Sequence, residues 1–160
     1  MAKAKGYQLF LMGMVAILSM IYVSISIEPP FDTSQYVEAD LIDVADQTVY
    51  IGYNCTAIVA DTSQERAESI ALGLEGWIDQ RPNTHDIFSQ TLKTFNITLN
   101  SVTVDSYNGQ FYYSSMIFYT PTKMLKLDAK PTDAIAVALR TKTPIYINKT
   151  LLAERGQTVC

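Results

Sequence analysis

The pattern of hydrophobic and polar positions changes its period several times along the chain, and each change predicts a different element. Residues 36–44 alternate apolar and polar side chains, as a half-buried strand does. Residues 48–53 and 55–61 are rich in β-branched and aromatic side chains, which indicates two more strands. From 63 to 79 the apolar positions recur at spacings of three and four, which is typical of an amphipathic helix. The first half of the domain is therefore predicted to hold three strands and then a helix.

The starts of the first two helices carry capping signals. Thr62 and Glu65 have the spacing of a capping box, and Trp77 is the last apolar position on the same helix. A second helix is predicted over 84–95, with Thr84 as its N-cap residue.

The second half of the domain contains a hairpin signal and alternating strands and helices. Asn108-Gly109 separates two strand-like runs, which predicts a tight β-hairpin. A strand, a third main helix, a strand and a short last helix follow over 124–129, 131–140, 144–147 and 149–155. Strands outnumber helices and follow one another in antiparallel-looking runs. The predicted class is α+β, a mostly antiparallel sheet with three main helices, plus one N-terminal transmembrane helix.

The transmembrane prediction rests on residues 7–27, which contain no charge and are long enough as a helix to cross the hydrocarbon core of a bilayer. Lys3 and Lys5 precede this run and acidic residues follow it, an asymmetry that places the N-terminus in the cytoplasm. A cleaved signal peptide is the alternative interpretation. The chain then divides into a cytoplasmic N-terminus, a transmembrane anchor, a linker and an exported domain, over 1–6, 7–27, 28–35 and 36–160. The expected location is the cell membrane, as a single-pass protein with its C-terminal domain outside the cytoplasm.

Charge complicates the choice of partner. The 16 acidic residues outnumber the 12 basic ones. A domain that holds a polyanion usually carries a basic patch, so this balance counts against nucleic acid. No basic residue lies between 97 and 122, although that segment is rich in aromatic side chains. We therefore interpret the aromatic hairpin as sheet packing or a subunit interface and expect a homo-oligomer.

Two short segments place polar chemistry at helix starts. In LDAKPTDAIAVALR, residues 127–140, Pro131 suits the first helical position and Asp133 favours the positive end of the helix. Capping does not explain why Asp128 and Lys130 lie beside the same helix start. In RPNTHD, residues 81–86, the only histidine of the chain stands at the start of the second helix.

These two segments, with PIYI after them, resemble the motifs of the bifunctional nuclease (BFN) domain family. Its members typically carry Arg-Pro-x-Thr-His-Asp and then Asp-Ala-Arg-Pro-Ser-Asp-Ala-Ile-Ala-Leu-Ala-Leu-Arg. The resemblance runs from about residue 36 to 156 in element order, and its second motif is the specific one. Lys130 stands where Arg is usual, and Thr132 where Ser is usual.

The resemblance implies a nuclease that cleaves phosphodiester bonds of DNA or RNA with Mg²⁺ or Mn²⁺. His85, Asp86 and Asp133 would be catalytic, with His85 moving the proton. Asp128 and Asp133, with help from Asp86, would hold the metal through hard oxygen ligands. The substrate's phosphates would be bound by Arg81, Lys130 and Arg140.

The same residues also suit a purely architectural role, in which they cap helices and tie two helix starts together by ion pairs. The rival function is then a non-catalytic extracytoplasmic binding or self-assembly domain. The hypothesis of a single site makes one expectation: the segments Arg81 to Asp86 and Asp128 to Asp133 converge on one surface region, with His85 and Asp133 on the same side of the domain.

The predicted topology can be tested on intact cells. Because residues 28–160 are expected outside the cytoplasm, added protease should digest the domain without permeabilisation of the membrane. A cytoplasmic protein that resists the same treatment is the control. Full protection of the domain until the membrane is opened would show that the orientation is wrong.

Overall fold

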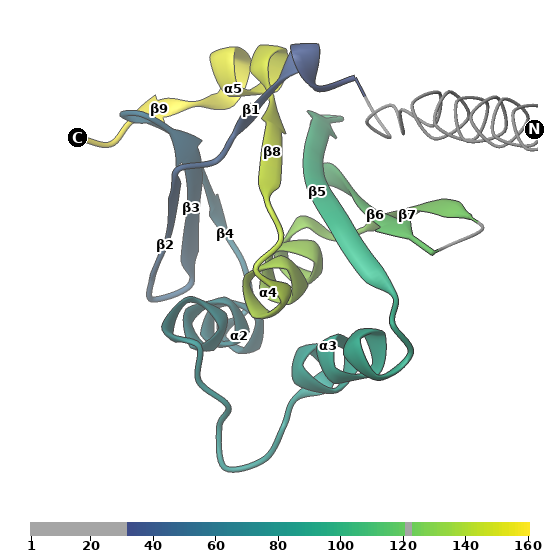
Figure 1. The fold of residues 1–160 in the computed structure, drawn as a ribbon. Coiled ribbons are helices and arrows are strands. Elements are labelled where there is room, and N and C mark those ends of the chain that lie inside the picture. The colour runs from purple at the N-terminus through teal and green to yellow at the C-terminus, as the bar shows by residue number, and fades with distance from the viewer. Residues whose placement is uncertain (1–31, 121–122) are drawn as a thin grey trace, which may run out of the picture. The chain divides into compact units, whose positions relative to one another are not determined.

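The computed structural model describes residues 32–120 and 123–160 (Figure 1), which form two sheets and the helices packed on them. The predicted transmembrane segment 7–27 lies outside the described residues. Within the described ranges, no helix has the length and apolar character needed to span a bilayer.

The first sheet has five strands in the order β1-β8-β5-β6-β7, and the second has four in the order β2-β3-β4-β9. Their bounds are β1 Tyr36–Glu38, β2 Leu41–Ala45, β3 Thr48–Tyr53, β4 Thr56–Asp61, β5 Thr98–Tyr107, β6 Tyr112–Tyr119, β7 Met124–Ala129, β8 Ile145–Asn148 and β9 Gln157–Thr158. All neighbouring strands are antiparallel except β5 and β8, which are parallel. The predicted α+β class with mostly antiparallel pairing is confirmed.

Four α-helices and one short 3-10 helix complete the described chain. They are η1 Thr33–Gln35, α2 Gln64–Glu75, α3 Thr84–Thr94, α4 Pro131–Thr141 and α5 Lys149–Arg155. The middle of α4 is fully buried, because its apolar residues from Ala134 to Ala138 pack on β5 and β6. Its remaining sides contact α2 and α3 (Figure 1). Helix α4 is therefore the central element against which the other two long helices are placed.

The strand predicted over 36–44 is two strands that belong to different sheets. The N–H of Ala39 donates to the carbonyl of Ile145 beside the first sheet, at 2.8 Å. The N–H of the next residue, Asp40, donates to the carbonyl of Gly52 in the second sheet, at 3.1 Å. The continuous alternation hid this crossing, because both strands bury one face and so keep the same period.

Several predicted helix ends were wrong by a few residues. Helix α2 stops at Glu75, because Gly76 adopts a left-handed conformation with φ 69°, and Trp77 beyond it is 68% exposed. The N-cap of α2 is Ser63 without a side-chain hydrogen bond, so the predicted Thr62 capping box is absent. The hairpin at Asn108-Gly109 is confirmed, with φ 97° at the glycine.

Candidate functional site

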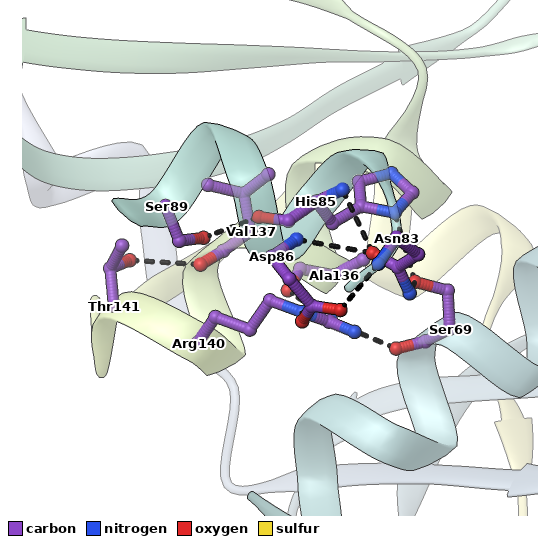
Figure 2. A network of polar contacts seen from close by, with 9 residues as sticks. All are labelled: Ser69, Asn83, His85, Asp86, Ser89, Ala136, Val137, Arg140 and Thr141. Carbon is purple, nitrogen blue, oxygen red and sulfur yellow. Dashed lines mark hydrogen bonds and ion pairs between the residues drawn. The ribbon is translucent and has the colours of Figure 1, made fainter. Parts of the chain in front are cut away.

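The two motifs meet where the first turn of α3 lies against the middle of α2 and the flank of α4. Figure 2 shows Ser69 of α2, Asn83, His85 and Asp86 at the start of α3, and Arg140 of α4 joined by hydrogen bonds. The expectation that the motifs share one region is confirmed for His85 and Asp133, whose Nε2 and Oδ1 atoms are 3.6 Å apart.

The start of α3 is fixed by a capping box. Asn83, not the predicted Thr84, is the N-cap residue, and its Oδ1 accepts hydrogen bonds from the N–H groups of His85 at 2.9 Å and Asp86 at 3.1 Å. The Oδ2 of Asp86 accepts in return from the N–H of Asn83 at 2.8 Å. The helix start and the Asp86 side chain therefore hold each other, which sets the direction in which His85 leaves the helix.

Asp86 also forms a buried ion pair with Arg140. The side chains of Arg140 and Asp86 are only 8% and 5% exposed, and Nε of the arginine donates to Oδ1 of the aspartate. Burial alone would raise the pKa of Asp86, but the hydrogen bonds from Arg140 and from the Asn83 N–H outweigh it and hold the pKa below its usual value. Asp86 is therefore ionised at neutral pH.

Arg140 links all three helices. Its Nη1 donates to the carbonyl of Ser69 in α2 and to that of Ala136 in α4, both at 2.9 Å. Gly73 makes room for it, since a Cβ there would lie 2.9 Å from Nη1. A glycine inside α2 would otherwise weaken the helix, so its place opposite the guanidinium has a clear packing reason.

His85 lies half-buried between a hydroxyl and a carboxylate. Its Nδ1 is 2.9 Å from the Oγ of Ser69, which also accepts a hydrogen bond from Nδ2 of Asn83 at 3.2 Å. The imidazole is 19% exposed and the facing Asp133 side chain 44%. Burial lowers the pKa of His85 below its ordinary value, the charge of Asp133 partly opposes this, and that of Arg140 adds to it. The ring is therefore neutral at pH 7.

Ser69 can hold this ring in each protonation state, because a hydroxyl both donates and accepts. With Ser69 as donor, Nδ1 accepts and the ring proton lies on Nε2; with Ser69 as acceptor, Nδ1 carries the proton and Nε2 is a base. The distance of 3.6 Å from Nε2 to Asp133 is longer than a hydrogen bond, so each atom keeps capacity for another partner. A histidine with these properties is suited to proton transfer at a partly exposed surface.

The other predicted site residues fall into two groups. Arg81, Asp128 and Lys130 have exposed side chains, with Lys130 as the N-cap residue of α4 and Asp128 on β7. Asp86 and Arg140 are buried and bonded to each other, a placement that favours an architectural role over contact with substrate. Over 32–120 and 123–160, no three His, Cys, Asp or Glu side chains gather closely enough to hold a metal ion. The predicted metal site stays a prediction.

Ser69 and Asn83 are the site residues that the sequence did not indicate. Ser69 lies on α2, sixteen positions before His85, and a buried serine among apolar helix positions carries no signal of its own. Asn83 could have been predicted, because Asn83 and Asp86 have the spacing of a capping box. Thr84 is also a common N-cap residue type, so the sequence offered two candidates for the N-cap.

Comparison with known proteins identifies the family. The sequence model described as Bifunctional nuclease domain matches residues 56–159, well over half of the chain. The chain belongs to the bifunctional nuclease domain family. Two relatives, each called an uncharacterized protein, come from the CDC 1551 and H37Rv strains of Mycobacterium tuberculosis. Each is 32% identical over 93 residues, which make up 58% of this chain and 55% of the relative.

The bifunctional nuclease domain match contains the whole candidate site but not the first three strands. It begins at the start of β4, whereas the sequence motifs had suggested a beginning near residue 36. Ser69, Asn83, His85, Asp133 and Arg140 all lie inside it. The chain spans about half the length of the curated relatives it matches.

The buried ion pair predicts a large stability effect. Asp86→Asn leaves the guanidinium of Arg140 buried without a balancing charge, which should lower the free energy of unfolding by about 3–5 kcal/mol. Glu68→Gln, an exposed acid on α2, is the control and should change it by less than about 0.5 kcal/mol. Chemical denaturation of the unchanged protein and the two variants measures both values. Equal stability of Asp86→Asn and Glu68→Gln would show that the ion pair does not stabilise the fold.

Proposed function

We propose that the domain hydrolyses phosphodiester bonds of nucleic acid, with His85 as the group that moves the proton. The observation that carries the proposal is the setting of His85: neutral at pH 7, anchored at Nδ1 by Ser69, and open at Nε2 beside Asp133. Membership of the family supports the same class of reaction.

In this proposal, water attacks the phosphorus and gives a proton to Nε2 of His85. The negative charge of Asp133, 3.6 Å away, favours the imidazolium that forms. The imidazolium can then give this proton to the leaving oxygen. A histidine can take part in both steps because its pKa lies near the working pH, so it both accepts and releases a proton readily. Asn83 and Ser69 keep the ring in place through both steps.

Charge stabilisation at the phosphate would come from exposed cations and a divalent metal. Lys130 and Arg81 are exposed and belong to the two motifs that meet at His85, which supports a role in binding phosphate oxygens. Mg²⁺ is usually held by one or two carboxylates together with substrate phosphates and water, so Asp133 is a sufficient protein ligand and Asp128 a possible second one. Such an ion would neutralise charge on the phosphate.

A non-catalytic self-assembly domain remains the second candidate, favoured by one observation. Strand β7 exposes Met124, Leu125 and Leu127, apolar side chains that are 53%, 50% and 41% exposed. Enzymatic activity and self-assembly are compatible, since β7 contributes only Asp128 to the proposed metal site and takes no part in the His85 hydrogen bonds.

The proposed activity predicts a specific pattern of loss. The full chain in mild detergent should cleave single-stranded DNA or RNA with Mg²⁺ or Mn²⁺, and EDTA should abolish cleavage. His85→Ala should lower the rate about 10²–10⁴-fold, the contribution of a positioned proton-transfer group. A thermal melt of His85→Ala, run beside the assay, checks that the variant is folded at the assay temperature, so that the lost rate can be assigned to the missing proton carrier.

The control for this assay is Glu68→Gln, which should keep full activity. Cleavage that survives His85→Ala at the rate of the unchanged protein would rule out His85 as the proton carrier. Cleavage unaffected by EDTA would rule out the metal.

The pH dependence of the reaction gives an independent test. His85 acts as a base when neutral, so kcat/KM should be constant above the ordinary histidine pKa of about 6.5 and fall only below it. Asp133→Asn removes the charge that raises the pKa of His85, so the acid limb of the residual activity should move to lower pH. Glu68→Gln should leave the limb in place, and a limb that moves to higher pH in Asp133→Asn would contradict the assignment.

A further inference from the structure

Strand β7 is the outer strand of the five-stranded sheet. Unlike most edge strands, it exposes several large apolar side chains. It pairs with β6 on one side, and within the described chain no strand pairs with its other side. Every side chain from Met124 to Asp128 is exposed, including three large apolar ones. Exposed apolar edge strands present unpaired N–H and C=O groups that readily bond another chain, and proteins normally protect them.

The backbone of β7 offers these groups at alternate residues. The N–H of Thr120 donates to the carbonyl of Lys123 at 2.9 Å, in the same register that pairs Tyr119 with Met124. Hydrogen-bonded positions alternate along an antiparallel pair, so Lys123, Leu125 and Leu127 point their backbone groups toward β6. Met124, Lys126 and Asp128 point theirs away from the sheet. A second strand must bond to these outward residues.

The apolar side chains of β7 continue a surface of the core. Leu125 lies opposite Phe118 and Leu127 opposite Met116, and both partners belong to the core between sheet and helices. Phe88 of α3 contacts Phe118 edge to face, with ring centroids 6.3 Å apart, and is itself 37% exposed. The exposed apolar side chains of Leu125 and Leu127 therefore lie directly beside buried core residues of β6.

We propose that this edge binds a second copy of the same chain, with β7 pairing antiparallel to β7 across a two-fold axis at Leu127. In this register Lys126 lies opposite Asp128 of the second copy, and Asp128 opposite its Lys126. Both are outward residues, so they form hydrogen-bonded pairs, and the two Leu127 side chains meet at the axis. Two opposite-charge pairs, the Leu127 pair and two pairs of Leu125 with Ala129 then form from a single short strand.

Other registers are less favourable on the same criteria. An axis at Lys126 places two lysines opposite each other, and an axis at Asp128 places two aspartates opposite each other, which is destabilising. An axis at Leu125 brings only Met124 and Lys126 together as outward pairs and forms no ion pair. The alternation of Lys126, Leu127 and Asp128 is therefore self-complementary, which is what a two-fold interface requires.

A symmetric pairing of this kind joins two five-stranded sheets into one and leaves neither copy with a free β7 edge. It also gives Asp128 a role that does not depend on a metal. The inference shares Asp128 with the proposed metal site, but it does not rest on the nuclease activity, because it is argued from the register and exposure of β7 alone.

Site-directed cross-linking tests the register. Residues opposite each other at a non-hydrogen-bonded antiparallel position have Cα atoms roughly 4.5 Å apart, close enough for a disulfide. In the full chain with Cys55→Ser and Cys160→Ser, Leu127→Cys should form a covalent dimer when an oxidant such as oxidised glutathione is added. Leu125→Cys is the matched control: it lies opposite Ala129 of the second copy, so two such cysteines are too far apart to link.

The control and the test variant separate the outcomes. Efficient cross-linking through residue 127 and little through residue 125 supports the pairing. The pairing is overturned if both variants link equally, if residue 125 links more strongly, or if neither residue links. A chain that assembles through another surface, or that binds a different partner at β7, would give one of these results.

Charge reversal tests the ion pairs on the equilibrium itself. Lys126→Asp and Asp128→Lys each create two like-charge pairs, so each should raise the dimer dissociation constant about tenfold or more in sedimentation of the full chain in detergent. The double variant restores opposite charges and should bring the constant back toward that of the unchanged protein. Lys123→Asp, just outside the paired residues, is the control. A double variant as weak as the single ones, or a Lys123→Asp effect as large, contradicts the proposed register.

Discussion

The ion pair between Asp86 and Arg140 is the interaction on which the candidate site depends. Two buried charges are tolerated only when they are paired and their remaining hydrogen-bonding capacity is used. Asp86 meets this condition through Arg140 and the Asn83 N–H. Arg140 meets it through Nε and Nη1, which donate to Asp86 and to carbonyls on α2 and α4, whereas its Nη2 is buried without a hydrogen-bond partner in the described chain. Because Arg140 of α4 bonds to Asp86 of α3 and to Ser69 of α2, the pair fixes where α3 starts relative to the other two helices. The position of His85, one residue before Asp86, follows from it.

This arrangement separates residues that hold the site from residues that could act in it. The buried pair keeps its charges away from water. His85 and Asp133 are partly exposed, and Nε2 of the histidine and Oδ1 of the aspartate each keep capacity for a further hydrogen bond. Ser69 connects the two layers: its carbonyl accepts from Arg140, and its hydroxyl contacts His85. A proton carrier needs this combination of a fixed ring and an open nitrogen, since misplacement by about 1 Å is costly to catalysis.

Much of the fold could be predicted from local patterns, and the errors have physical causes. The hairpin at Asn108-Gly109 and Pro131 at the first position of α4 follow from backbone rules that tertiary contacts do not alter. The crossing between sheets at Ala39 could not be read, because the alternation continues through it.

The motifs correctly predicted that His85 and Asp133 are neighbours. The pairing of Asp86 with Arg140 could not be predicted from the sequence. Asp86 and Arg140 are 54 positions apart, and their pairing depends on how α3 and α4 pack. A carboxylate in a helix's first turn has the same local pattern whether it faces solvent, a metal or a buried arginine. Ser69 was missed for a similar reason, since only the packing of α2 against α3 places it beside the ring.

The most direct measurement is an NMR titration of the histidine ring. His85 is the only histidine in the sequence, so its ring signals need no assignment by mutation in a chain without a histidine tag. The account predicts a pKa below the ordinary value of about 6.5 in the unchanged protein, because the ring is partly buried against Ser69. It further predicts a still lower pKa in Asp86→Asn, because this variant loses a negative charge that raises the pKa of His85 and leaves the charge of Arg140, which lowers it, without a balancing acid. An ordinary or raised pKa in the unchanged protein, or one that Asp86→Asn raises or leaves unmoved while the protein stays folded, would contradict it.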